Sequence, residues 1–178
     1  MSNDKFIPLQ RTVFTEVDLV HAITSAYKIM FGKSPYVQEV GIFWAHFALE
    51  CGKGKACYNW NIGNIKYSKG HDYTMYPCGE VINGVQKHFD PPHPQTWFRS
   101  YPSLQDAVQA HFSFLKLYRY SGALDAAALL DPDLYVEELK KGGYFTADLE
   151  RYKGGVKRLF EEFMEKYSNE VDTDPYEK

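Results

Sequence analysis

An apolar run that ends in a single carboxylate constrains this chain more than any other feature of its sequence. Most positions between 36 and 49 are apolar, and Phe43, Phe47 and Glu50 stand at i, i+4 and i+7. That spacing predicts a buried helix with Glu50 on its apolar face. The next residues, Cys51-Gly52-Lys53-Gly54, contain two glycines, and either glycine can take the left-handed conformation that ends a helix.

A carboxyl group in that position is expected to have a raised pKa. It is partly desolvated and lies at the negative end of the helix dipole, and both effects disfavour the charged form. A carboxylic acid that keeps its proton near neutral pH can act as a general acid. The alternative is an ordinary surface ion pair between Glu50 and Lys53 or Lys55.

Composition narrows the function classes. The 178 residues fit one compact domain, 44% of them are apolar, and aromatic residues reach 16%. Core packing accounts for most aromatic rings, but exposed rings also line sugar-binding grooves by stacking on pyranose faces. The net charge is −3 and no run of Lys or Arg suggests a nucleic-acid track, so we expect no nucleic-acid partner.

The cysteines do not predict a disulfide framework or a metal site. Cys51, Cys57 and Cys78 are odd in number, so at least one thiol is free. Together with His71 they lack the short Cys and His spacings of zinc sites. We expect buried thiols and no metal.

The N-terminal residues have no basic segment followed by an apolar run, and no stretch approaches the length of a membrane span. We therefore expect a protein made in the cytoplasm, without membrane insertion, that needs a delivery partner if its substrate lies outside.

Periodicity and turn signals predict a mainly helical α+β domain over residues 15–168. We expect a small β-hairpin lobe at about 71–101, with a turn at Asn83-Gly84 and a further strand at 97–99. An N-terminal extension, 1–14, and an acidic tail, 169–178, expected to be disordered, flank the domain. The expected helices are 15–31, one opened by Ser34-Pro35 and ended by Glu50, 103–122, 123–130, 132–141, and 146–167 with a weak point at Gly154-Gly155.

A second carboxylate is needed if Glu50 acts on a glycosidic bond, because such hydrolases place two carboxyl groups across that bond. Glu80, at the start of the expected hairpin, is the preferred partner, and Asp72 is the second choice. The alternative is that Glu80 is an ordinary acid beside a turn.

Five segments, spread over about residues 40 to 160, resemble one family in the same order: ALECGKGK (48–55), NWNIGNIK (59–66), EVING (80–84), FRSYPS (98–103) and GYFTADLERY (143–152). The chain resembles lysozyme-like peptidoglycan hydrolases, most of all the bacterial and phage glucosaminidases of glycoside hydrolase family 73, the flagellar type included. The resemblance implies a lysozyme-like fold, a peptidoglycan strand as substrate and no cofactor.

The resemblance also implies residue roles. Glu50 corresponds to the catalytic acid, Glu80 to the hairpin carboxylate that positions water or stabilises the oxocarbenium-like centre, and Tyr144 to a cleft tyrosine that holds the 2-acetamido group. Substrate contacts are expected from Asn59, Trp60, Asn61, Asn64, Tyr67, Trp97 and Tyr152.

Several departures keep alternatives open. Lys53 stands where the family has Trp, Cys51 replaces a hydroxyl residue, and the 59–66 wording also resembles lytic transglycosylases. N-acetylmuramidase or transglycosylase action on the same polymer therefore competes with glucosaminidase action, and the substrate's acetamide can replace a protein nucleophile. A catalytically weak wall-binding module is the alternative from another class. A phage endolysin or virion lysin is the favoured setting, with an injected effector as its rival.

Overall fold

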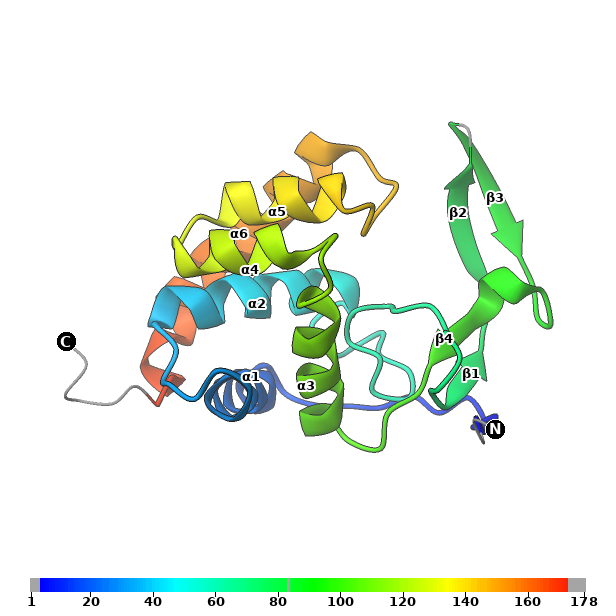
Figure 1. Cartoon of the computed structure of the whole chain (residues 1–178), viewed down its shortest axis with the longest axis horizontal. Coiled ribbons are helices and arrows are strands. Elements are labelled where there is room, and N and C mark those ends of the chain that lie inside the picture. Colours follow the sequence, from blue (N-terminus) through cyan, green and yellow to red (C-terminus); the bar gives the residue numbers. More distant parts are fainter. Residues whose placement is uncertain (1–3, 83, 173–178) are drawn as a thin grey trace.

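The computed structural model describes residues 4–82 and 84–172, which form a helical part and a small β lobe (Figure 1). The helices are α1 (Glu16–Phe31), α2 (Val37–Glu50), α3 (Leu104–Leu115), α4 (Ser121–Ala128), α5 (Pro132–Lys141) and α6 (Leu149–Lys166), with short 3-10 turns at Pro94–Thr96 and Ser168–Glu170. The strands are β1 (Tyr73–Met75), β2 (Cys78–Ile82), β3 (Val85–Phe89) and β4 (Trp97–Arg99). This arrangement confirms the expected α+β class, helical with a β lobe.

Helix α1 begins and ends where its sequence predicts. The backbone N–H of Thr15 donates to Asp18 Oδ2 at 2.8 Å, and the N–H of Asp18 donates to Thr15 Oγ1 at 3.1 Å, which is a capping box. Gly32 ends the helix with a left-handed φ of 70°.

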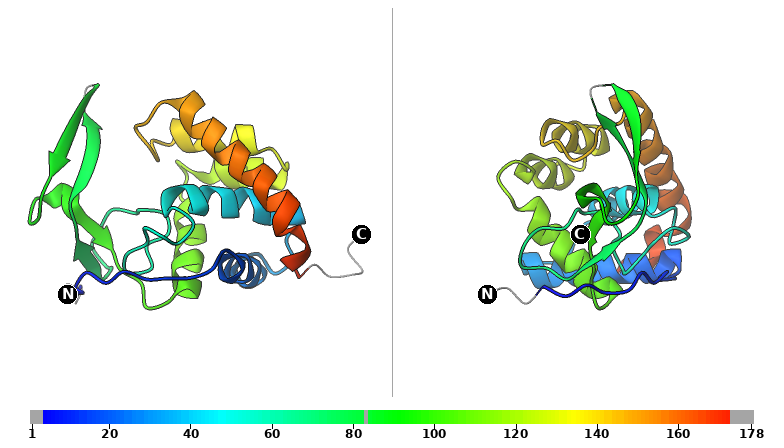
Figure 2. Two further views of the ribbon diagram at one scale, coloured as in Figure 1. Left: turned by 180° about the vertical axis from the view of Figure 1, so that it is seen from behind. Right: turned by 90° about the vertical axis from the view of Figure 1, so that its right-hand side faces the viewer.

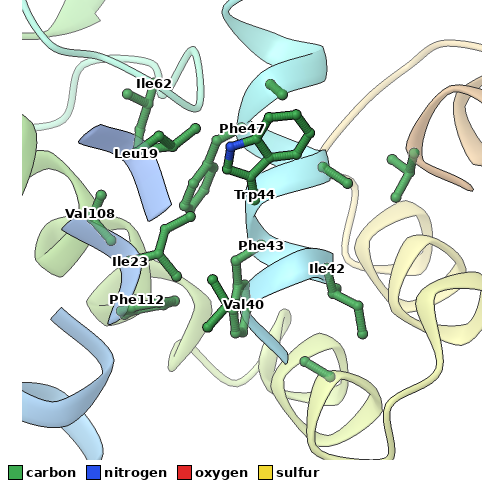
Figure 3. Close-up of a cluster of buried hydrophobic side chains, with 14 of the residues drawn as sticks. Leu19, Ile23, Val40, Ile42, Phe43, Trp44, Phe47, Ile62, Val108 and Phe112 are labelled. Carbon is green, nitrogen blue, oxygen red and sulfur yellow. The ribbon is translucent and has the colours of Figure 1, made fainter. Parts of the chain in front are cut away.

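Helix α2 runs through the middle of the helical part (Figure 1) and contributes more buried residues than any other helix. Its side chains meet those of α1 and α3 in the cluster of Figure 3, and its backbone lies so close to α6 that a Cβ at Gly41 would stand 2.7 Å from the Phe163 ring. The fully buried side chains of this cluster include Leu19, Ile23, Phe43, Trp44, Phe47 and Phe112.

The start of α2 differs from the prediction. The helix is capped by Tyr36 and not by Ser34-Pro35, because the Glu39 carboxylate accepts the Tyr36 N–H at 2.7 Å. Its end is as expected: Gly52, Lys53 and Gly54 all have positive φ, at 55°, 56° and 80°, and turn the chain sharply after Glu50.

Two antiparallel strand pairs make the β lobe. Strand β1 pairs with β4 through Thr74 and Phe98, and β2 pairs with β3 from Cys78–Phe89 to Ile82–Val85. The β2–β3 hairpin stands at the opposite end of the molecule from α6's C-terminal end (Figure 2). Gly84 has a φ of 75°, as a tight turn requires, whereas Asn83 of the predicted turn lies outside the described residues.

The N-terminal extension is tied to the loop after α2. The N–H of Thr12 donates to the carbonyl of Cys57 at 3.0 Å, and the N–H of Asn59 donates to the carbonyl of Gln10 at 2.8 Å. Phe6 forms an isolated bridge to Tyr73 of β1. The segment therefore braces both parts of the molecule.

Helix α5 has the predicted bounds, whereas α3, α4 and α6 differ from the predictions by a few residues at their ends. Helix α3 ends at Leu115, before the predicted Gly122, and α6 begins at Leu149, after an Asp148 side chain that accepts the Arg151 N–H at 2.9 Å. Helix α6 is unbroken at Gly154-Gly155. A Cβ at Gly155 would lie 3.1 Å from the Leu49 side chain, so the glycine allows α6 to pack closely against α2.

The first residues of the predicted disordered tail are ordered. Val171 is buried, and Asp172 forms a 2.8 Å ion pair with Lys28 of α1. Residues 173–178 of that tail lie outside the described residues. Within the described part of the chain, no helix combines the length and apolar character of a membrane span.

Candidate active site

A cleft of about 570 Å³ lies between the end of α2, the β2–β3 hairpin and the loop that joins α5 to α6. The two carboxylates that the sequence singles out, Glu50 and Glu80, both line it. Its walls also include Asn64, Lys66, Tyr76, Phe98, Tyr144, Phe145 and Tyr152.

Glu50, the last residue of α2, is held by two hydrogen-bond donors. The Tyr152 hydroxyl donates to Glu50 Oε1 at 2.5 Å, and Asn64 Nδ2 donates to Glu50 Oε2 at 3.0 Å. Burial raises the pKa of Glu50 above its usual value, although both hydrogen bonds act in the opposite direction. The geometry can therefore present an oriented carboxyl group that keeps its proton to higher pH than a solvated one.

Tyr152 comes from the other side of the helical part, one turn into α6. Its ring stacks on Phe145 with centroids 3.8 Å apart and planes 5° from parallel. Burial raises the pKa of Tyr152 well above its usual value, so the phenol stays a hydrogen-bond donor to Glu50 at neutral pH.

The loop at residues 61–66 brings Asn64 to Glu50. Asn64 adopts a left-handed φ of 49°, and its Nδ2 also donates to the Glu50 carbonyl at 3.0 Å, which caps the end of α2. Beside it, Gly63 accepts the Tyr144 hydroxyl at its carbonyl at 2.7 Å. A Cβ at Gly63 would stand 2.8 Å from that hydroxyl and would also collide with the His111 ring, so only glycine fits there.

Glu80 faces the cleft from β2 and is paired with a lysine. Its Oε1 lies 2.7 Å from Lys66 Nζ, and the same ammonium stands 3.9 Å above the Phe98 ring and donates to the Gln95 carbonyl at 2.6 Å. Asp72, the second choice, does not line the cleft, and its carboxylate accepts the backbone N–H of Lys5 at 3.0 Å.

Tyr144 lines the cleft as expected, but its hydroxyl proton is already engaged by Gly63. Burial raises the pKa of Tyr144 well above its usual value, so it stays protonated. The hydroxyl therefore meets a substrate as a hydrogen-bond acceptor, while the hydrogen bond to Gly63 holds the floor loop in place.

Two of the expected substrate-binding asparagines serve the backbone instead of the cleft. Asn59 and Asn61 are both buried. Asn59 Nδ2 donates to the Pro8 carbonyl at 3.0 Å, and Asn61 exchanges hydrogen bonds with both backbone groups of Ile65, at 2.8 and 2.9 Å. They shape the loop that carries Asn64, because their amide groups satisfy buried backbone atoms.

The expected groove aromatics also lie elsewhere. Trp60 stacks on Phe14, and Trp97 stacks on Tyr73 with centroids 4.9 Å apart. Tyr67 packs beside that pair and donates its hydroxyl to Asp4 at 2.7 Å. None of the three lines the cleft.

Sequence reasoning missed three aromatic residues that also line the cleft: Tyr76, Phe98 and Phe145. Phe98 points into it because neighbouring residues of a strand face opposite sides, which places Trp97 on the other face of β4. Tyr76 stacks on Phe98 at 4.0 Å, and its hydroxyl lies 3.4 Å from Asn64 Oδ1. Alternation within 97–99 predicts that Trp97 and Phe98 face opposite sides, but not which of them faces the cleft.

His46 and Lys53, on either side of Glu50 in the sequence, both make structural contacts. His46 is fully buried and its Nδ1 lies 2.7 Å from the Tyr135 hydroxyl, while burial lowers the pKa of His46 to about 3, so it stays neutral. Lys53 forms an ion pair with Glu162 of α6 at 2.5 Å. Lys53, which stands where the family named above has Trp, thus joins the turn after α2 to α6.

The cysteines are free thiols, with Cys51 and Cys57 buried, and burial raises the pKa of Cys51 to about 12. The described residues contain no cluster of three or more side chains of the metal-binding types.

Solved structures of peptidoglycan hydrolases share this architecture. A mutant of the peptidoglycan hydrolase from Sphingomonas sp. A1 superposes with a TM-score of 0.62 and 22% identity, over 81% of this chain and 92% of that one. A truncated glycoside hydrolase domain of FlgJ from Salmonella typhimurium superposes with a TM-score of 0.55 and 17% identity, over 84% of this chain and 98% of that one. The catalytic domain of the autolysin Auto from Listeria monocytogenes superposes with a TM-score of 0.59 and 18% identity, over 93% of this chain and 91% of that one.

No family model and no curated protein matches the sequence. The chain therefore has the α+β lysozyme-like fold of these peptidoglycan hydrolases, at identities too low to carry more than the fold.

Proposed function

We propose that this chain is a peptidoglycan glycoside hydrolase that cleaves the β-1,4 bond between N-acetylglucosamine and N-acetylmuramic acid, with Glu50 as the general acid. The observation that supports it most is the state of Glu50, a half-buried carboxyl with a raised pKa, oriented by Tyr152 and Asn64 at the wall of a 570 Å³ cleft.

In the proposed reaction Glu50 gives its proton to the glycosidic oxygen while the bond from that oxygen to the anomeric carbon breaks. The anomeric carbon develops positive charge, and Glu80 stabilises that charge or takes a proton from the attacking water. Water then supplies the hydroxyl on the anomeric carbon. The transfer leaves Glu50 ionised, and the hydrogen bonds from Tyr152 and Asn64 stabilise that carboxylate.

The pair of Glu80 and Lys66 supports this division of roles. Glu50 lies at a helix end among buried aromatic groups, whereas Glu80 contacts an ammonium group at 2.7 Å. Two carboxyl groups in such different surroundings are suited to opposite tasks, one as acid and one as anion.

The bond that is cut and the fate of the anomeric carbon are decided by product analysis. Purified sacculi are incubated with the protein and the new chain ends are identified. Reducing N-acetylglucosamine ends support the proposal, N-acetylmuramic acid ends indicate a muramidase, and anhydromuramic ends indicate a lytic transglycosylase.

The assignment of Glu50 is tested by Glu50→Gln, with Glu161→Gln on the exposed surface of α6 as the matched control. We expect Glu50→Gln to lose activity by about 100-fold or more, since general acid catalysis contributes roughly that factor. Wild-type activity in Glu50→Gln would overturn the proposal. The expected phage setting and the delivery route stay predictions from the sequence.

A further inference from the structure

A second hollow, of about 310 Å³, adjoins the cleft on the far side of the 63–66 loop. The two spaces adjoin, because both are lined by Gly63, Asn64, Lys66, Gly143 and Tyr144. The second hollow is walled by residues that the proposed reaction does not use: Arg99, Phe114, Leu117, Arg119 and Tyr120.

The hollow is cationic although the whole chain carries a net charge of −3. Lys66, Arg99 and Arg119 line it, and none of its lining residues is Asp or Glu. Lys66 is neutralised by Glu80 at 2.7 Å. Among the residues that the structure describes, no ion pair joins either arginine to a carboxylate.

Both guanidinium groups are held in place without being neutralised. Arg99 Nη2 donates to Ser68 Oγ at 2.7 Å and the group stands 5.7 Å from the Phe114 ring centroid. Its Nε is buried and has no hydrogen-bond partner. Arg119 stands 4.5 Å from the Tyr120 ring centroid and donates to the Tyr120 hydroxyl.

Such a site matches a ligand that carries a carboxylate and some apolar surface. A guanidinium presents a planar set of donors that binds a carboxylate with two parallel hydrogen bonds. The Phe114, Leu117 and Tyr120 side chains offer apolar contact beside those donors.

If the proposed function holds, the polymer in the cleft supplies this chemistry, because muramic acid units carry short peptides with free carboxylates. We propose that the hollow of Arg99 and Arg119 is a subsite for a stem-peptide carboxylate. It binds the peptide on a muramic acid unit lying next to Glu50. The protein then distinguishes peptide-bearing strands from bare glycan.

The test compares two soluble substrates, peptide-bearing glycan strands and the same strands after an amidase has removed the peptides and left only the lactyl carboxylate on each muramic acid. The variant is Arg119→Gln, since Arg119 is exposed and has no ion pair within the described residues, and the control is Arg158→Gln on α6. We expect the wild type to show a ~10-fold lower KM for peptide-bearing strands, the size of one charge-assisted contact.

In Arg119→Gln that advantage should shrink to nearly nothing, with kcat on both strands and KM on bare strands unchanged, and Arg158→Gln should behave as wild type. The advantage should also fall at high salt, because the contact is between charges. Equal KM values of the wild type for the two strands, or an equal loss on both in Arg119→Gln, would overturn the subsite.

A binding measurement separates this inference from the proposed reaction. A peptide-bearing disaccharide and the same disaccharide without peptide are titrated into the Glu50→Gln protein by calorimetry. Tighter binding of the peptide-bearing form, lost with the added Arg119→Gln change, supports the subsite even if the wild type cuts neither strand. Equal affinities reject it even if Glu50 proves to be the acid.

Discussion

The Tyr152 hydroxyl donates a 2.5 Å hydrogen bond to Glu50 Oε1 and so joins α6 to the last residue of α2, 102 positions earlier in the chain. Asn64 approaches the other carboxylate oxygen from the loop at 3.0 Å. The carboxyl group is therefore oriented by two elements that do not depend on its own helix. Its pKa is set by the balance between burial, which raises it, and these two donors, which lower it.

Tyr152→Phe is expected to raise the pKa of Glu50 further, because it removes the larger of the two opposing hydrogen bonds and keeps the buried ring. A general acid works while it is protonated, so the alkaline limb of the kcat/KM profile should move to higher pH. The maximum should fall about tenfold as orientation is lost. Tyr118→Phe, on a side chain that is 97% exposed, is the control. An unchanged profile would show that Tyr152 does not tune Glu50.

Glu50→Gln is expected to stabilise the folded protein above pH 4.5, the usual pKa of the group. Because burial raises the folded-state pKa, the wild-type carboxyl favours folding fully only below its unfolded pKa. This contribution of the carboxyl group to stability is lost as the pH rises through its raised folded-state pKa. The neutral amide of the variant does not titrate, so its contribution to stability does not change with pH. The Tm difference between variant and wild type should therefore grow between pH 4 and pH 8, as roughly expected from linkage. A difference that is constant with pH would contradict the raised pKa.

Gly63→Ala should cost about 1–3 kcal/mol in the free energy of unfolding, because its methyl group would collide with His111 and the Tyr144 hydroxyl. Activity should fall as well, since the same loop carries Asn64 to Glu50. Gly154→Ala on α6, with no atom within 4 Å of the added methyl, should instead gain about 0.5–1 kcal/mol. Urea unfolding of the two variants measures both numbers, and a neutral Gly63→Ala would mean that the loop can relax.

Glu80→Gln is expected to lower kcat by about 100-fold, because it removes the carboxylate that stabilises the anomeric carbon or takes a proton from water. Tm should change little, because this side chain is partly exposed and supports no buried contact. Lys66→Met is the companion variant: it removes the ammonium that Glu80 contacts at 2.7 Å and should change KM more than kcat. Release of new chain ends from sacculi reports both effects. Full activity in Glu80→Gln would leave Glu50 as the only catalytic carboxyl and favour acetamide participation or a transglycosylase.

The sequence by itself determined the elements whose signals are local. The start of the first helix at Thr15, the spacing of Phe43, Phe47 and Glu50, and Gly84 of the hairpin turn each depend on neighbours within a few residues, and each was predicted. It also singled out Glu50 and Glu80, which share one cleft. Helix ends were less certain, as at Tyr36 and Asp148, because a cap depends on which side chain reaches the free N–H groups.

Only the tertiary structure decided which side chains meet around Glu50. Tyr152 lies 102 positions away, and nothing local shows that its hydroxyl reaches Oε1. Asn59 and Asn61 look like Asn64 in the sequence, yet they turn inward because buried backbone groups need partners, and only Asn64 faces the acid. Likewise Phe98 and not Trp97 lines the cleft, since the face that a strand presents is set by its packing.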